Sequence, residues 1–132
     1  MQNKKNPFKS YTQTGVLTAN RETILLMLYN GAIRFLKMAI TASESSQTNE
    51  KNLYVGKAMD IVNELRASLN HKGDEQIASS LESLYEFIQD RLLKGSIENN
   101  VSHLNEALGI LTTLKDGWEA AVQSLKNQAV AK

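Results

Sequence analysis

The pattern of apolar and polar residues along the chain predicts four long helices and no strand. Within four segments, apolar residues recur every three or four positions, which is the period of an amphipathic helix. Polar stretches such as "SESSQTN" and "NHKGD" separate these segments. The predicted helices run from about Arg21 to Ser43, Glu50 to Asn70, Glu75 to Lys94 and Asn100 to Lys126.

Several predicted helix ends carry residues that favour them. Asn20 and Asp74 can accept hydrogen bonds from the first turns of the helices that follow them. Gly73 is available for a left-handed turn, and Gly95 is expected to end the third helix. Four amphipathic helices joined by short connections predict an all-α protein, an antiparallel up-down four-helix bundle. Leu81 and Trp118 lie on the apolar stripes, so we expect both to be buried.

The first predicted helix is apolar over more of its surface than one core contact requires. The segment "ILLMLYNGAIRFL", Ile24–Leu36, begins with six apolar residues in succession. Successive residues of a helix point about 100° apart, so six of them point in every direction. Leu26, Ile33 and Ile40 form a second row beside the core stripe, and Tyr29 lies between the two rows.

This wide apolar surface has two explanations, and the sequence leaves both open. The second row can face another helix of the bundle, because a bundle helix touches two neighbours. Alternatively, it can line a groove that binds an amphipathic segment of a partner. Tyr54 and Ile61 likewise flank the core stripe of the second helix. The candidate partner-binding residues are Leu26, Tyr29, Ile33, Tyr54 and Ile61.

The segment "NPFKSYTQTG" predicts a short helix ahead of the bundle, because Pro7 suits a first helical position and Gly15 suits a stop. Phe8 and Tyr11 are three residues apart and would share one face. We expect residues 1–17 to be a flexible N-terminal cap segment whose Phe8 and Tyr11 form a lid over the groove. The alternative is a disordered basic tail. Residues 18–126 would then form the bundle domain, and 127–132 a flexible tail.

Composition narrows the class of protein. A length of 132 residues suits one domain. The net charge of +1 and the lack of a basic stripe argue against nucleic-acid binding. The longest apolar run is too short to insert into a membrane, and the first twenty residues do not form a signal peptide, so a cytoplasmic protein is expected. The chain has no cysteine and therefore no disulfide.

Candidate catalytic and metal-ligating groups are sparse. His71 and His103 are the only histidines, and no Glu-x-x-His motif accompanies them. Glu82, Glu86 and Asp90 follow a four-residue spacing that favours a solvated helix face, with Asp90 able to pair with Lys94. Phosphate-binding loops and nucleophile motifs are missing. We therefore expect neither an enzyme nor a cofactor or metal.

Four stretches carry a resemblance to a known family. They are "VLTANRETILLMLYNGAIRFLKMA", "VGKAMDIVNELRASLN", "IASSLESLYEFIQDRLLKGSIEN" with the pair Leu84–Tyr85, and "LNEALGILTTLKDGWEAA" with Trp118. Together these stretches resemble the flagellar secretion chaperone family, FliS, from about Tyr11 to Ala121. The chain departs from the family where Asn20–Arg21 stands in place of the usual Ser-Pro.

The resemblance implies a cytoplasmic binding protein without catalysis. Its client would be the disordered C-terminal segment of flagellin, whose apolar helices it would cover to prevent premature polymerisation before delivery to the flagellar export gate. A generic four-helix adaptor or oligomerisation module is the alternative, and an exposed groove could also support a homodimer.

Overall fold

The computed structural model describes residues 20–131. Within this range the chain is all-α, as predicted, with four helices and no strand. The helices are α2 (Arg21–Glu44), α3 (Thr48–Ala67), α4 (Glu75–Ile97) and α5 (Val101–Ala131). The predicted N-terminal lid, with Phe8 and Tyr11, lies outside the described residues.

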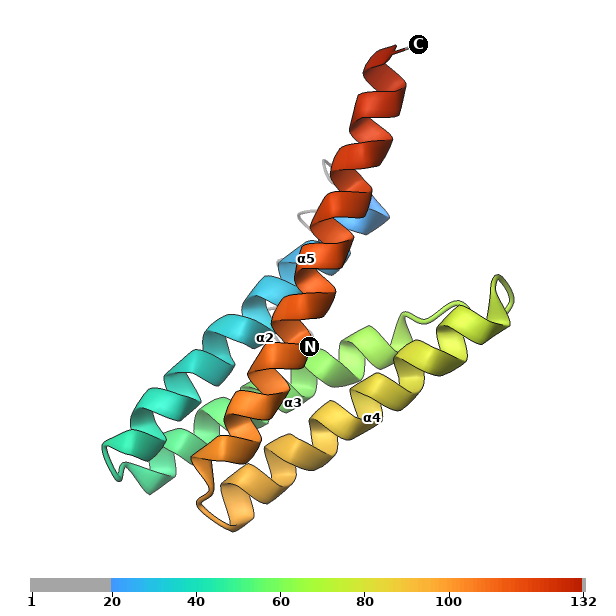
Figure 1. The fold of residues 1–132 in the computed structure, drawn as a ribbon. Helices are drawn as coiled ribbons and strands as arrows, with labels where there is room; N and C mark the ends of the chain where they lie inside the picture. Colours follow the sequence, from blue (N-terminus) through green and yellow to red (C-terminus); the bar gives the residue numbers. More distant parts are fainter. Residues whose placement is uncertain (1–19, 132) are drawn as a thin grey trace, which may run out of the picture.

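The four helices form a ring in which each contacts its neighbours along the chain and α5 returns to contact α2. Figure 1 shows that α2 lies beside α5 and α3 beside α4, and that the two pairs diverge from the end that holds the α2–α3 and α4–α5 connections. We call this end the closed end and the opposite one the open end. The core is therefore continuous at one end of the molecule and splayed at the other.

The helix ends agree only partly with the expected ones. Asn20 Oδ1 accepts a hydrogen bond from the backbone N–H of Thr23 at 2.9 Å, and Asp74 Oδ1 accepts one from Ile77 at 3.1 Å, so both predicted N-caps are confirmed. α5 continues past Lys126, which makes residues 127–131 of the predicted tail helical.

The predicted roles of two glycines were wrong. No described glycine has a positive φ, and the left-handed residues are Ser46 and Asn99, in the closed-end connections. Gly95 lies inside α4, which runs on to Ile97. A Cβ atom at Gly95 would lie 2.5 Å from Cδ2 of Leu104, so this glycine lets α4 and α5 approach closely instead of ending a helix.

A buried lysine closes the core beneath the α4–α5 connection. Lys51, on α3, is buried although it carries a charge. Its ammonium donates to the backbone carbonyl of Ser96 at 2.8 Å and to the side-chain oxygen of Asn99. Hydrogen bonds of this kind offset the cost of burying a charge, and they hold the start of α3 against the end of α4.

α2 is the only described helix that is long and apolar enough to cross a membrane, by length and composition alone. Its apolar residues have another role, because Leu28, Ala32, Leu36 and Ala39 are buried in the core. One helix of this length and composition is only weak evidence for a membrane span, since core helices pass the same test.

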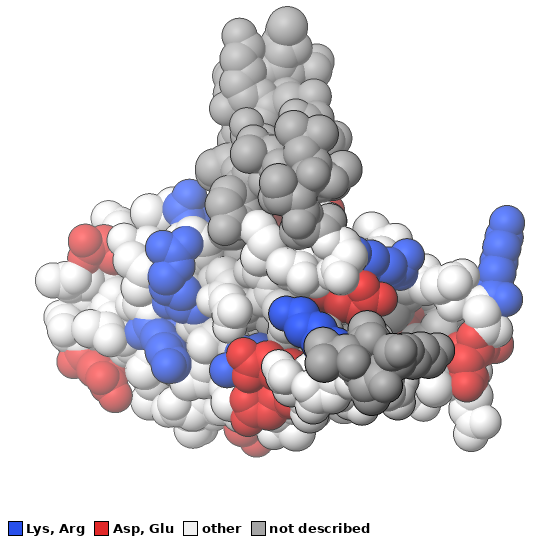
Figure 2. Space-filling model, turned by 90° about the horizontal axis from the view of Figure 1, so that it is seen from above, with Lys and Arg blue, Asp and Glu red and all other residues white. Residues whose placement is uncertain are grey.

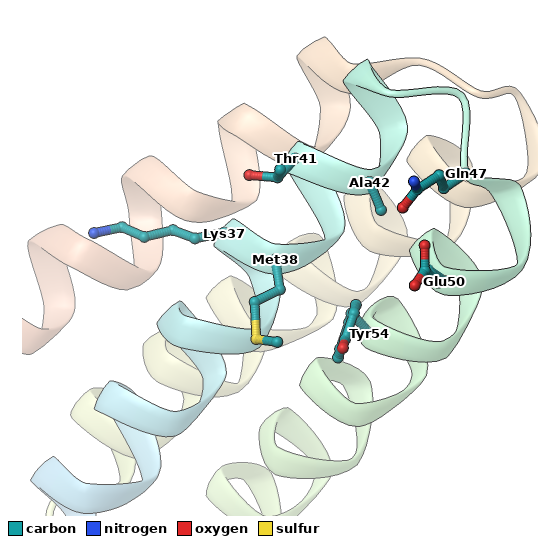
Figure 3. A pocket seen from close by; sticks show the side chains of 7 residues that line it. All are labelled: Lys37, Met38, Thr41, Ala42, Gln47, Glu50 and Tyr54. Atoms are coloured by element: carbon teal, nitrogen blue, oxygen red, sulfur yellow. The ribbon is translucent and has the colours of Figure 1, made fainter.

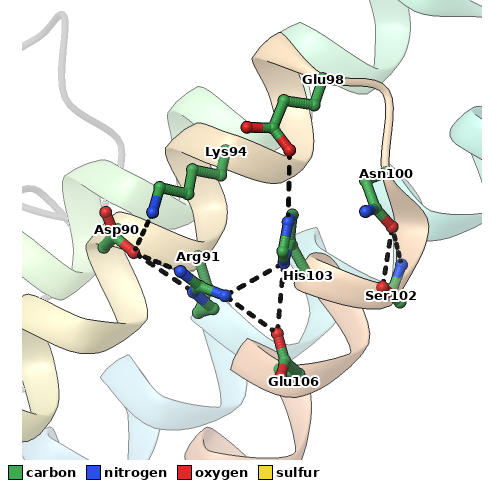
Figure 4. A network of polar contacts seen from close by, with 8 residues as sticks. All are labelled: Asp90, Arg91, Lys94, Glu98, Asn100, Ser102, His103 and Glu106. Atoms are coloured by element: carbon green, nitrogen blue, oxygen red, sulfur yellow. Dashed lines mark hydrogen bonds and ion pairs between the residues drawn. The ribbon is translucent and has the colours of Figure 1, made fainter.

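A network of polar contacts joins α4 to α5 near the closed end (Figure 4). Arg91 contacts Asp90 at 2.7 Å and Glu106 at 3.4 Å, and His103 lies between Glu98 and Glu106. The expected Asp90–Lys94 ion pair is present at 3.5 Å. Hydrogen bonding by Arg91 lowers the pKa of Asp90, and hydrogen bonding by His103 and Arg91 lowers the pKa of Glu106.

The close contact at Gly95 predicts a difference between glycines. We expect Gly95→Ala to lower the free energy of unfolding by about 1–2 kcal/mol, because overpacking against buried Leu104 outweighs the gain in helix propensity. Gly109→Ala is the matched control, since a Cβ there meets nothing within 4 Å, and it should stabilise α5 by about 0.5–1 kcal/mol. Urea unfolding measures both, and equal effects of the two substitutions would contradict the packing argument.

The α4–α5 network predicts acid sensitivity. Asp90 and Glu106 have lowered pKa values in the folded state, so the stability they contribute is present above their unfolded pKa of about 4 and is lost as the pH falls through the lower folded values. The melting temperature should therefore fall below about pH 4, and Arg91→Ala should make that fall shallower. Lys115→Ala removes ion pairs within α5, and it should leave the steepness of this fall in melting temperature unchanged.

Candidate functional site

A groove lies between α2 and α3 near the closed end (Figure 3). It encloses about 330 Å³. The residues that line it are Lys37, Met38, Thr41, Ala42, Gln47, Glu50 and Tyr54. We call it the α2–α3 groove. Met38 and Ala42 enter from α2 because they lie four residues apart, on the helix side that faces α3.

The wall of the α2–α3 groove is apolar and its rim is charged. The rings of Phe35 and Tyr54 stack with their centroids 6.2 Å apart, which fixes Tyr54 across the two helices. Arg34 and Lys57 lie over the Phe35 ring at 4.9 and 5.7 Å. Met38 remains exposed. The groove thus offers an apolar floor formed by Met38, Ala42 and Tyr54, with Lys37 and Glu50 as its charged lining residues.

A second hollow, the open-end cleft, lies where α4 and α5 diverge. It encloses about 180 Å³. Tyr85, Leu81 and Trp118 line it, together with the first turn of α2 and the α3–α4 connection. Ile77, one of its lining residues, and Leu84, on the same helix, are exposed.

Beneath the open-end cleft, three polar side chains join three helices. The hydroxyls of Tyr29 from α2 and Tyr85 from α4 are hydrogen-bonded to each other. Trp118 Nε1, from α5, donates to the Tyr29 hydroxyl at 3.0 Å. Burial raises the pKa of both tyrosines above their ordinary value, so both hydroxyls stay protonated at neutral pH and act as hydrogen-bonding groups.

Comparison with known proteins decides the family. The model of the family described as "Flagellar protein FliS" matches residues 4–125. The chain belongs to the FliS family. The flagellar secretion chaperone FliS of Bacillus subtilis strain 168 is 34% identical over 120 residues, which cover 91% of this chain and 89% of that protein.

Further similarities agree with the FliS assignment. The flagellar secretion chaperone FliSB of Pseudomonas aeruginosa is 32% identical over 115 residues, covering 84% of this chain and 91% of that protein. A crystal structure of a bacterial flagellar chaperone has the same fold, with a TM-score of 0.74, 19% identity, and coverage of 92% of this chain and 98% of that one. FliS is a family of chaperones of flagellar secretion and not of enzymes.

The five candidate partner-binding residues fall into two groups in this FliS fold. Tyr29, Ile33 and Ile61 are buried in the core cluster, whereas Leu26 and Tyr54 are partly exposed. Tyr29 reaches Trp118, so this side of α2 faces α5. A second neighbouring helix therefore accounts for the burial of Tyr29. The role of all five residues in binding stays a prediction.

Sequence reasoning missed the exposed apolar residues that border the hollows. Ile77 and Leu84 follow the apolar stripe of α4 but are exposed, and Leu81 and Trp118, expected to be buried, are only partly buried. The reason is the divergence of α4 and α5, which a periodic pattern does not encode. Met38 could have been found, because it lies three residues after Phe35 on the same helix.

The carboxylates of α4 have ion-pair partners, so they do not form the purely solvated helix face that their spacing favours. Arg66 from α3 contacts Glu82 and Glu86 at 3.0 Å each, and His71 contacts Glu75 and Glu82. The spacing along α4 could not reveal these partners, because they come from α3 and from the α3–α4 connection. Among the described residues, no group of three or more metal-ligating side chains could hold a metal ion.

The tyrosine–tryptophan network predicts coupled losses of stability. Tyr85→Phe should lower the free energy of unfolding by about 1–2 kcal/mol, because the buried Tyr29 hydroxyl loses a partner. Trp118→Phe removes the other hydrogen bond to Tyr29. A double-mutant cycle measured by denaturant unfolding should give a nonzero coupling energy, and strictly additive effects would show that the two bonds act independently.

Proposed function

We propose that this FliS family member binds the C-terminal segment of flagellin as an amphipathic helix and keeps it from polymerising before export. The observation that carries the proposal is the α2–α3 groove, where exposed Met38 and partly exposed Tyr54 form an apolar floor in a chaperone of flagellar secretion. An amphipathic helix buries its apolar face in a groove of this kind.

The groove suits a segment that orders as it binds. Both of its helices are held by the core, and α2 also by the tyrosine–tryptophan network, so the chaperone supplies a preformed surface and the client bears the entropic cost of folding. The rim carries Lys37 and Glu50. Charges of both signs at the rim can pair with the polar face of a client helix and fix its direction.

The proposal includes all five candidate residues and gives them two different roles. They are Leu26, Tyr29, Ile33, Tyr54 and Ile61. Tyr54 and Leu26 would contact the client directly, since both are partly exposed. Tyr29, Ile33 and Ile61 support the helices from within the core and would meet a client only if α5 moved away.

Three parts of the proposal rest on the family resemblance and the sequence. They are the lid formed by Phe8 and Tyr11, action in the cytoplasm, and delivery of the complex to the flagellar export gate. A generic four-helix adaptor or a homodimer is the alternative, and neither would need to bind flagellin.

The direct test is a titration of the full chain with a synthetic peptide of the flagellin C-terminal segment. Calorimetry should show saturable 1:1 binding with a negative heat-capacity change, because apolar surface is buried. Trp118 is the only tryptophan, so its fluorescence reports separately whether the open-end cleft is also covered. If calorimetry detects no heat of binding and the Trp118 fluorescence does not change at peptide concentrations of about 1 mM, the generic adaptor is favoured.

Substitutions in the α2–α3 groove should weaken the complex without unfolding the chaperone. Met38→Asp and Tyr54→Ala should each lower the affinity for the flagellin peptide by about tenfold or more, because both remove apolar contacts at the groove floor. Leu93→Asp, at an exposed leucine on α4, is the matched control and should leave the affinity unchanged. Circular dichroism verifies the fold, and equal affinities of all variants would place the client elsewhere.

A further inference from the structure

Two cations from different helices meet over one aromatic ring beside the α2–α3 groove. Cζ of Arg34, on α2, lies 4.9 Å from the centroid of the Phe35 ring, and Nζ of Lys57, on α3, lies 5.7 Å from the same centroid. The Phe35 ring also stacks on Tyr54, which lines the groove. The charged groups of Arg34 and Lys57, which we call the cation pair, therefore lie next to the apolar floor of the groove.

The cation pair has no anionic partner in the described part of the chain. Among residues 20–131, neither Arg34 nor Lys57 forms an ion pair or a hydrogen bond. An aromatic ring attracts a cation only weakly at an exposed site, and it does not replace a hydrogen-bond acceptor. Arg34 is exposed and Lys57 is partly exposed, so the N–H donors of both side chains can be reached by a partner.

Carboxylates lie before and after the cation pair along the chain without pairing with it. On α3, Glu50 precedes Lys57 by seven residues and Asp60 follows it by three, and both carboxylates are exposed. On α2, no carboxylate occurs between Glu22 and Glu44. A spacing of three residues would allow a Lys57–Asp60 ion pair, but the Lys57 ammonium lies over the aromatic ring of α2 instead. The positive site is therefore small and bounded by negative charge along α3.

The cation pair lies about one helical turn from the groove floor. Arg34 precedes Met38 by four residues on α2, and Lys57 follows Tyr54 by three residues on α3. Because α2 runs toward the closed end and α3 runs away from it, both steps lead toward the open end (Figure 1). A helix that lies along the groove would therefore place over the cation pair a residue three or four positions from the side chain that enters the groove.

We propose that the cation pair selects the client of the α2–α3 groove by binding an aspartate or glutamate side chain of the client helix, three or four residues from its apolar anchor. This inference rests on the proposed function, because it specifies the chemistry of the segment that the groove binds. A guanidinium can donate two parallel hydrogen bonds to a carboxylate, and the Lys57 ammonium adds a second positive charge. A helix without that carboxylate would cover both cations and leave them unpaired, so it should bind more weakly.

The carboxylates that bound the cation pair favour a protein helix over a phosphate polymer. A nucleic acid or an anionic lipid surface presents a continuous row of negative charges, and Glu50 and Asp60 would repel those that pass over them. An amphipathic helix can instead present one carboxylate to the cation pair and neutral or basic residues to Glu50 and Asp60. Charge complementarity therefore points to an acidic side chain on the client.

The probe is a pair of synthetic peptides of about 14 residues, or four helical turns, with both ends blocked so that only side chains carry charge. Both peptides have the same apolar face. One carries glutamate four residues before and four residues after a central leucine, and the other carries glutamine at these positions. In calorimetry with the full chain, the glutamate peptide should bind about tenfold more tightly, and this preference should shrink as salt is raised. Equal affinities of the two peptides would overturn the proposal.

Variants test whether the two cations cause the preference. Arg34→Gln and Lys57→Gln should each reduce it to about threefold or less, because each removes one positive charge from the site. Their affinity for the glutamine peptide should stay unchanged, which verifies that the groove is intact. Lys72→Gln is the matched control, since this exposed lysine also forms no ion pair among the described residues. If Lys72→Gln lowers the preference as much as Arg34→Gln does, net charge explains it and the proposal is wrong.

The flagellin peptide separates this inference from the proposed function. If the flagellin peptide does not bind, the proposed function fails, whereas a preference for the glutamate peptide would still support the carboxylate site. If the flagellin peptide binds and neither Arg34→Gln nor Lys57→Gln weakens its binding, this inference alone is wrong.

Two further measurements test other occupants of the cation pair. Single-stranded DNA of about 15 nucleotides and phosphatidylglycerol vesicles should bind more weakly than the glutamate peptide. Tighter binding of either one that Arg34→Gln abolishes would assign the cation pair to phosphate groups and overturn the proposal. A dimer in sedimentation that becomes a monomer in Arg34→Gln would make a second copy the occupant, with the same consequence.

Discussion

The hydrogen bonds among Tyr29, Tyr85 and Trp118 join three helices at the level where α4 and α5 begin to separate. Towards the closed end, α4 and α5 touch at Gly95 and Leu104, and buried Lys51 holds α3 to the end of α4. Towards the open end, Arg66 and His71 contact α4, but Ile77 and Leu84 remain exposed. A buried polar network constrains geometry more strictly than apolar packing does, because each hydroxyl must keep its partners. It therefore marks the boundary between a rigid half of the molecule and a splayed half.

This division explains which parts of the structure could be predicted from the sequence. Helix number, the Asn20 and Asp74 caps and most core positions follow from local periodicity and capping chemistry. The roles of Gly95 and Leu81 depend on distances between helices, which no pattern within one helix contains. The wide apolar surface of α2 was correctly recognised. The assignment of Tyr29 to a core network, however, required Trp118, which lies 89 residues further along the chain.

The exposed apolar surface of the α2–α3 groove has a simple physical origin. Its apolar residues are exposed because they lie just outside the angular range that one helix contact covers. Lys37 and Glu50 border this surface, and charged side chains of both signs lie beside one another on the face of the molecule that Figure 2 shows. A small protein can therefore present a binding surface without weakening its core, provided that charged residues separate the apolar regions and discourage self-association.

The glycines of α5 have a consequence for its dynamics. Gly109 and Gly117 both lie within the helix with open space where a side chain would be, and each makes the helix less stable than alanine would by about 1 kcal/mol. Beyond Trp118, Val122 is the only buried apolar residue among those whose burial is described. The end of α5 should therefore open by local unfolding at a much lower free energy than the whole domain. Amide hydrogens there would exchange with solvent orders of magnitude faster than those around Leu104. The last turns of α5 can therefore unfold and change conformation while the rest of the domain stays folded.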